Sequence, residues 1–155
     1  MKGRSCALKL AQALLIIAWP LFLLLSGLYS LATPDFIRQE YARADFPPSQ
    51  RFDASERLTI AQSTLHYLLS DEDIGFLESL SDDEGPVYNK RELAHMVDVK
   101  NLMRKAFLIH RLAGLAILLS LSVLIFLGEG RRALAGSLTG ALVLVGFIAL
   151  IGAIA

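Results

Sequence analysis

The stretch "AILLSLSVLIFLGEGRRALAGSLTGALVLVGFIAL", residues 116–150, holds two long apolar runs separated by the short polar segment GEGRR. A helix that crosses the hydrocarbon core of a bilayer needs about 20 consecutive apolar residues. The two runs, taken as 106–128 and 133–155, meet this length, and a third run occupies 11–32. The connection between the last two runs is so short that their helices must be antiparallel neighbours. The sequence therefore predicts an all-α or mainly α membrane protein with three transmembrane helices.

The composition agrees with this class. The chain has 155 residues, 54% of them hydrophobic, and a mean hydropathy of +0.51, values typical of a small membrane protein. The formal net charge is zero, so nothing indicates a nucleic-acid partner. The single cysteine, Cys6, excludes an intramolecular disulfide.

Two cationic clusters predict how the chain crosses the membrane. Lys and Arg favour the cytoplasmic side of short flanking segments; they precede the first run and recur as Arg131 and Arg132 between the last two. A cleaved signal peptide is the alternative for the first run, but that run is longer than the 7–15-residue apolar core of such a signal. The predicted segments are a cytoplasmic N-terminus (1–10), span one (11–32), a small extracytoplasmic helical segment (33–105), span two (106–128), a cytoplasmic hairpin (129–132) and span three (133–155).

Span three carries glycines at helical spacing. Gly136 and Gly140 form a G-x-x-x-G pair, which in membrane helices allows close helix packing. Ordinary glycine enrichment in membrane helices is the alternative. In either case we expect span three to pack against protein rather than stand alone in lipid.

The segment 33–105 contains 14 acidic and nine basic residues and so has a net charge of −5. Within it, Asp53 with Glu56 three residues later predicts a capping box at the start of a helix. The expected apolar face of that helix comprises Leu58, Ala61, Leu65, Leu68 and Leu69. His66 falls near the edge of this face and is predicted to be an ordinary surface histidine. The acids at 82–84 lack an oxygen-ligand loop pattern, so we expect a solvated turn and no metal or cofactor site.

A second capped helix starts in "VYNKRELAHMVDVKNLM", residues 87–103. Asn89 with Glu92 predicts its N-terminus, and no breaker follows before span two. Glu92, Asp98 and Arg91 lie three or four residues from His95, so all can be its neighbours on a helix. A carboxylate beside a histidine can fix its tautomer and raise its basicity, as a general base requires. A surface helix with ordinary charge pairs is the alternative.

His110 cannot share a site with His95, because 15 residues of helix separate them by about 22 Å. We expect His110 and Arg111 to extend toward the membrane interface.

Three segments resemble one known family: "TPDFIRQEYARADFPPSQRF", "ERLTIAQSTLHYL" and "YNKRELAHMVDVKNLM". The chain is similar, over roughly residues 10 to 128, to bacterial integral membrane proteins whose characterised members are lipoprotein intramolecular transacylases. This resemblance implies an enzyme that moves an acyl chain from the diacylglyceryl group of a lipoprotein to the α-amine of its N-terminal cysteine. It also implies a location in the bacterial cell membrane, with membrane lipids and diacylated lipoproteins as partners.

The resemblance assigns roles to residues near His95. His95 would be the catalytic base, oriented by Asp98 or Glu92, and Arg91, Lys90 and Tyr88 would bind lipid or substrate. Family members are also expected to have a fourth span and a second histidine-bearing segment after span three, neither of which lies within residues 1–155. A non-catalytic membrane interaction or scaffold protein is the alternative function. The sequence makes no prediction of the oligomeric state.

Overall fold

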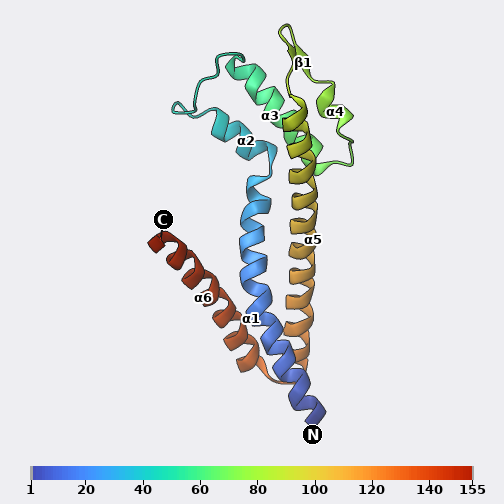
Figure 1. The fold of residues 1–155 in the computed structure, drawn as a ribbon. Coiled ribbons are helices and arrows are strands. Elements are labelled where there is room, and N and C mark those ends of the chain that lie inside the picture. Colours follow the sequence, from blue (N-terminus) through green and yellow to red (C-terminus); the bar gives the residue numbers. More distant parts are fainter. Residues whose placement is uncertain (1, 155) are drawn as a thin grey trace. The chain divides into compact units, whose positions relative to one another are not determined.

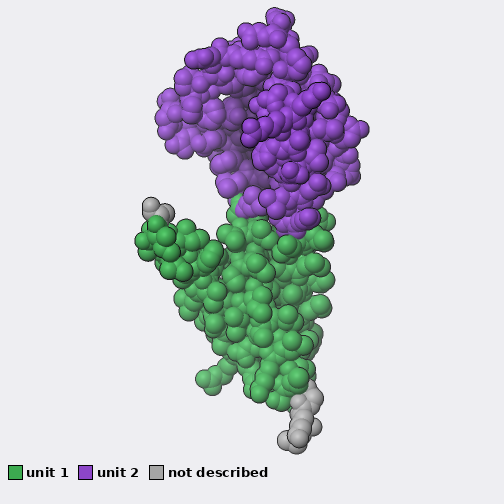
Figure 2. Space-filling view, in the orientation of Figure 1, with its two compact units in different colours: residues 1–27, 107–155 green, residues 28–106 purple. Residues whose placement is uncertain are grey.

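The computed structural model describes residues 2–154 of the chain, and the side chains of residues 4–154. It divides into two compact units, coloured separately in Figure 2. Unit 1 comprises residues 1–27 and 107–155, and unit 2 comprises residues 28–106. Helix α5 contributes residues to both units, so it is the element that carries the chain from unit 2 into unit 1.

Three helices are long and apolar enough to cross a membrane, which confirms the predicted fold class. They are α1 (Lys2–Leu31), α5 (Lys90–Phe126) and α6 (Gly130–Ile154). Helix α1 begins nine residues before the predicted span, because no helix breaker separates the polar N-terminal residues from the apolar run. Helix α5 is unbroken over 37 residues, as the sequence predicted. The membrane boundaries within these helices stay predictions.

In unit 1, α1 packs against both α5 and the first half of α6 (Figure 1). Leu15 of α1 and Leu124 of α5 are fully buried at the centre of this core. His110 takes part in the packing as well: its ring stacks on Phe22 at 4.5 Å, and Nε2 lies 2.9 Å from Ser26 Oγ. The predicted extension of His110 toward the interface is therefore wrong. A polar side chain between apolar helices is stabilised by an interhelical partner, and Ser26 supplies one.

The predicted hairpin between α5 and α6 is closed by backbone hydrogen bonds. Gly128 has φ +76°, a conformation that costs glycine little because it has no Cβ. Its N–H donates to Ile125 O at 3.0 Å, and Glu129 N–H donates to Leu124 O at 2.8 Å. This is the Schellman arrangement that ends helices and satisfies their last carbonyl groups.

The glycine pair of α6 lies against α1. A Cβ on Gly140 would come within 2.8 Å of Trp19 Cβ and 3.1 Å of backbone oxygens of α1, and Gly136 is similarly enclosed. The close-packing interpretation of Gly136 and Gly140 is thus confirmed. The expected packing of span three on protein is found in its first half, whereas every described residue from 145 to 154 is exposed. Small residues hold α6 near α1 only where they recur on the facing side.

Unit 2 is built around α3 (Ala54–Leu69), with α2 (Pro34–Tyr41), α4 (Gly75–Glu78) and the first turns of α5. The predicted acidic turn is the tip of an antiparallel hairpin of β1 (Ser81–Asp82) and β2 (Gly85–Pro86). The capping box of Asp53 and Glu56 at the start of α3 is confirmed.

The buried face of α3 differs in part from the predicted one. Leu65 is buried as expected, but Leu69 is 46% exposed and Tyr67, which was not predicted, is 2% exposed. Tyr67 forms a small core with Leu77 of α4 and Leu93 of α5. Contacts with these later elements, rather than the apolar pattern of α3 alone, decide which face is covered.

We expect Gly140→Ile to destabilise unit 1, because its side chain would overlap backbone atoms of α1. Overpacking of this kind costs about 1–3 kcal/mol. Gly146→Ile is the matched control, since no atom lies within 4 Å of a Cβ at that position. Thermal unfolding of the two variants in the same detergent measures the difference; equal melting temperatures would contradict the observed α1–α6 packing.

Candidate functional site

The first turn of α5 is capped as predicted. The N–H groups of Arg91 and Glu92 donate to Asn89 Oδ1 at 2.9 and 3.0 Å. Glu92 Oε2 in turn accepts the Asn89 N–H at 2.8 Å. The Glu92 carboxylate is therefore engaged in holding the start of the helix.

His95 lies on an exposed face of α5, six residues after the N-cap Asn89. Arg91 and Asp98 are exposed on the same face, four residues before and three after it. Among the described residues, His95 forms no hydrogen bond or ion pair, so the structure places these side chains on one face without joining them. Asp98 also has no partner there, whereas Glu92 has one. The assigned roles of His95, Asp98 and Glu92 stay predictions.

The opposite face of α5 carries a buried lysine that the sequence analysis missed. Lys100 is 5% exposed, and its Nζ lies 4.0 Å from the centroid of the Tyr67 ring. The same ammonium donates to the Glu72 carbonyl oxygen. Burial lowers the pKa of Lys100 below its ordinary 10.5. Its spacing of seven residues from the apolar Leu93 was the available signal, because i and i+7 share a helix face.

One turn further on, Arg104 binds the same part of the chain. It donates to Ser70 O at 3.3 Å and to Asp71 Oδ1 at 2.8 Å. Ser70 O, just past the C-terminus of α3, lies at the negative end of the helix dipole, where cations are favoured. Lys100 and Arg104 therefore fix the rotation of α5 about its axis, and so decide that His95 faces outward.

Tyr88, Lys90 and Glu92 come together at an open cavity of about 510 Å³ that Arg51 also lines. The Tyr88 hydroxyl lies 2.6 Å from Thr64 Oγ1, and the Thr64 hydroxyl hydrogen points to Ile60 O at 2.7 Å. Tyr88 is consequently the donor in its bond to Thr64. Burial raises the pKa of the Tyr88 phenol. The structure thus uses Tyr88 to join α3 to the start of α5; His95, Arg91 and Asp98 do not line this cavity.

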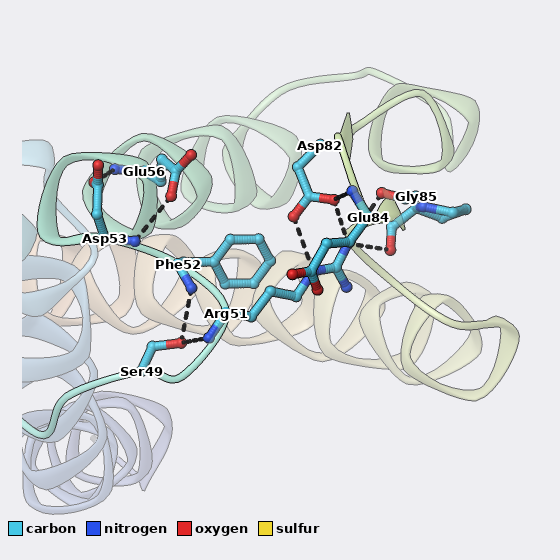
Figure 3. A network of polar contacts seen from close by, with 9 residues as sticks. Ser49, Arg51, Phe52, Asp53, Glu56, Asp82, Glu84 and Gly85 are labelled. Atoms are coloured by element: carbon cyan, nitrogen blue, oxygen red, sulfur yellow. Dashed lines mark hydrogen bonds and ion pairs between the residues drawn. The ribbon is translucent and has the colours of Figure 1, made fainter.

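Arg51 organises the hairpin that precedes α5 (Figure 3). Its guanidinium donates to both carboxylate oxygens of Asp82 at 2.8 and 2.6 Å, and to the carbonyl oxygens of Gly85 and Pro86 at 3.0 and 3.1 Å. The hydrogen bonds from Arg51 hold the pKa of Asp82 below its usual range. The sequence alone offered no signal for this pair, because 31 residues separate its members.

We expect Lys100→Ala to loosen unit 2, because it removes both the contact with Tyr67 and the hydrogen bond to Glu72. A desolvated cation–π contact and the lost packing of the lysine stem together suggest about 1–3 kcal/mol. Lys105→Ala changes an exposed lysine on the same helix and should have little effect. Chemical denaturation followed by circular dichroism compares the two, and an equal loss in both would refute the assigned role of Lys100.

The Arg51–Asp82 pair predicts a pH dependence. A carboxyl whose pKa is lower in the folded state stabilises the fold above its unfolded pKa and loses that contribution as pH falls through the folded value. The unfolded value is near 3.8. Asp82→Asn should therefore lower the melting temperature relative to wild type at pH 6, and the gap should close as pH falls below about 4. Asp83→Asn, at the exposed neighbouring acid, should show no such convergence.

The chain was compared with protein families, curated proteins and solved structures. A family model described as lipoprotein intramolecular transacylase Lit matches residues 13–155. No curated protein and no solved structure matched the chain. The family match continues through α6, beyond the roughly 10–128 over which the sequence resemblance was seen. The chain belongs to the lipoprotein intramolecular transacylase family.

Proposed function

We propose that this protein is an O-to-N acyltransferase of the bacterial cell membrane that acts on diacylated lipoproteins. In this proposal an acyl chain moves from the glyceryl group on the N-terminal cysteine to the α-amine of the same cysteine. The observation that carries the proposal is His95, an exposed histidine without a bound partner among the described residues, on the outer face of α5 in a chain of this family.

The reaction requires one group that accepts a proton and later donates it. A base removes a proton from the cysteine α-ammonium, and the resulting amine attacks the ester carbonyl carbon. The new C–N bond gives a tetrahedral oxyanion whose nitrogen still carries two protons. Its C–O bond to glycerol then breaks, the alkoxide takes the proton held by the histidinium, and the nitrogen releases its second proton to solvent. An ester becomes an amide and a free hydroxyl, with no water consumed. Because the substrate supplies the nucleophile, His95 suffices as general base and general acid.

The neighbours of His95 take supporting roles. Asp98 is the better candidate to orient the imidazole, because the Glu92 carboxylate is committed to the helix cap. Arg91 and Lys90 are exposed cations beside it, suited to a developing oxyanion or to lipid phosphate. Tyr88 supports the site indirectly, since its hydroxyl hydrogen is committed to Thr64.

The proposed topology puts the N-terminus and the α5–α6 hairpin in the cytoplasm and residues 33–105 outside. His95 precedes the predicted membrane boundary at Ala106 by 11 residues, about 16 Å along the helix. Leu102 lies two turns below His95 on the same side of α5 and is 68% exposed. It offers an apolar contact for an acyl chain between the hydrocarbon core and the histidine.

Expression in a bacterium that processes lipoproteins but lacks this activity tests the proposal. Mass spectrometry of lipoprotein N-termini should show an amide-linked lyso-form with the wild-type protein and a loss of at least 100-fold with His95→Ala, about the contribution of general acid–base catalysis. His66→Ala is the matched control, because His66 is exposed in the same unit and has no role in the proposal. It should leave the product unchanged.

Two outcomes would overturn the proposal. Unchanged lipoprotein N-termini in cells with well-folded wild-type protein would favour the non-catalytic membrane interaction or scaffold function. Full activity of His95→Ala would remove His95 from the mechanism.

A further inference from the structure

Unit 2 contains a cavity that the proposed reaction does not use. It has a volume of about 250 Å³ and lies between the first half of α3 and the β1–β2 hairpin. Its apolar lining includes Phe52, Ile60, Leu80 and Val87, and hydroxyl groups stand among these apolar walls. Figure 3 shows the Phe52 ring directed between α3 and the hairpin.

The walls of this cavity are held by specific contacts. Val87 N–H donates to Leu80 O at 2.9 Å and closes the base of the hairpin. Arg51 binds Asp82 on one side and stacks over the Phe52 ring at 4.8 Å on the other. The cavity is therefore a preformed feature of unit 2, as binding sites usually are.

The size of the cavity limits its ligand. Pockets that bury drug-sized molecules have volumes of about 300–1,000 Å³, so a cavity of about 250 Å³ suits a single large apolar group. Its surroundings are acidic: the segment 33–105, with 14 acidic and nine basic residues, has a net charge of −5, and Glu56 and Asp82 line the cavity. Arg51 forms ion pairs with both Asp82 and Glu84, so Glu56 and the exposed Asp83 remain as acids without a paired cation in the described part of the chain. A ligand with an apolar group flanked by positive charges complements this site.

Distance along α5 excludes an acyl chain held in the bilayer. Val87 lies just before α5, whose first residue, Lys90, precedes the predicted boundary at Ala106 by 16 residues, about 24 Å. A lipid chain spans half of the hydrocarbon core, about 15 Å. The proposed reaction holds the lipidated cysteine at His95, and Lys90 precedes His95 by only five residues, about 8 Å along the helix. An extended polypeptide advances about 3.3 Å per residue and covers this distance in about three residues.

We propose that this cavity binds a large apolar side chain of an exported polypeptide, flanked by lysine or arginine. In the context of the proposed function, on which this assignment rests, the polypeptide is the part of the substrate lipoprotein about three residues after its lipidated cysteine. The cavity then selects among lipoproteins by their protein sequence, while the chemistry takes place at α5.

Unlipidated fluorescent peptides test this site without the reaction. A ten-residue Gly/Ser peptide with a central Lys-Leu-Lys should bind the full-length protein in nanodiscs of neutral lipid, measured by fluorescence anisotropy. Peptides with Lys-Ser-Lys or Glu-Leu-Glu at the centre should bind at least tenfold more weakly. The first lacks the apolar side chain, and the second lacks the flanking positive charges.

Substitutions locate the binding. Thr59→Trp places a bulky side chain at an exposed position of the cavity lining and should weaken Lys-Leu-Lys binding at least fivefold. Glu56→Gln keeps a side chain that can complete the capping box but removes the charge, and should weaken binding and its dependence on salt. Leu69→Trp, at an exposed apolar position on the same helix that does not line the cavity, should bind as wild type does. Melting curves establish that each variant is folded.

Equal binding of the three peptides, or wild-type binding by folded Thr59→Trp, would overturn the inference. The two proposals fail separately. Lipoprotein conversion without Lys-Leu-Lys binding removes only the peptide site. Peptide binding without any conversion removes the acyltransferase and the assignment to a lipoprotein, and leaves a peptide-binding cavity.

Discussion

The buried ammonium of Lys100 is the interaction on which unit 2 depends. A lysine loses hydration when it is buried, and this one recovers part of the loss from the face of Tyr67 and the carbonyl of Glu72. Because both partners belong to α3 or to the turn after it, the contact fixes the angle at which α5 meets α3. Leu93, seven residues before Lys100, lies on the same buried face of α5. The face that carries His95 must therefore point outward.

The two ends of α5 are set by local chemistry of different kinds. At Asn89 a side-chain capping box stops the helix from extending upstream, and at Gly128 a positive φ turns the chain back into α6. Between these ends one helix serves two environments, a charged one in unit 2 and an apolar one in unit 1. In unit 1 the glycine pair of α6 allows α6 to lie against α1. Close packing in unit 1 therefore depends on the lack of side chains at Gly136 and Gly140, whereas unit 2 depends on a buried charge.

Local signals in the sequence predicted much of this fold. Apolar length predicted α1, α5 and α6, and the capping residues Asp53 and Asn89 predicted where α3 and α5 begin, because these features act over a few residues. Long-range contacts escaped prediction.

Tyr67 and Lys100 are 33 residues apart in the sequence but lie in contact, and neither position alone predicts this contact. Arg51 and Asp82 form a pair although the whole of α3 lies between them in the sequence. His110 of α5 contacts Ser26 of α1, although 84 residues separate them in the sequence. For the candidate site, the sequence located the exposed histidine face and the capping role of Glu92, but it did not reveal that Tyr88 is bound to Thr64.

Because α5 is one unbroken helix, a small change of tilt at one end displaces the other end by a large distance. From Phe126 to His95 is 31 residues, about 46 Å of continuous helix. If the helix stays straight, a change of about 10° in tilt at the Phe126 end would displace His95 by about 8 Å. Membrane helices adjust their tilt to the thickness of the hydrocarbon layer, so in the proposed topology the lipid composition of the bilayer would change the position of His95 relative to the membrane.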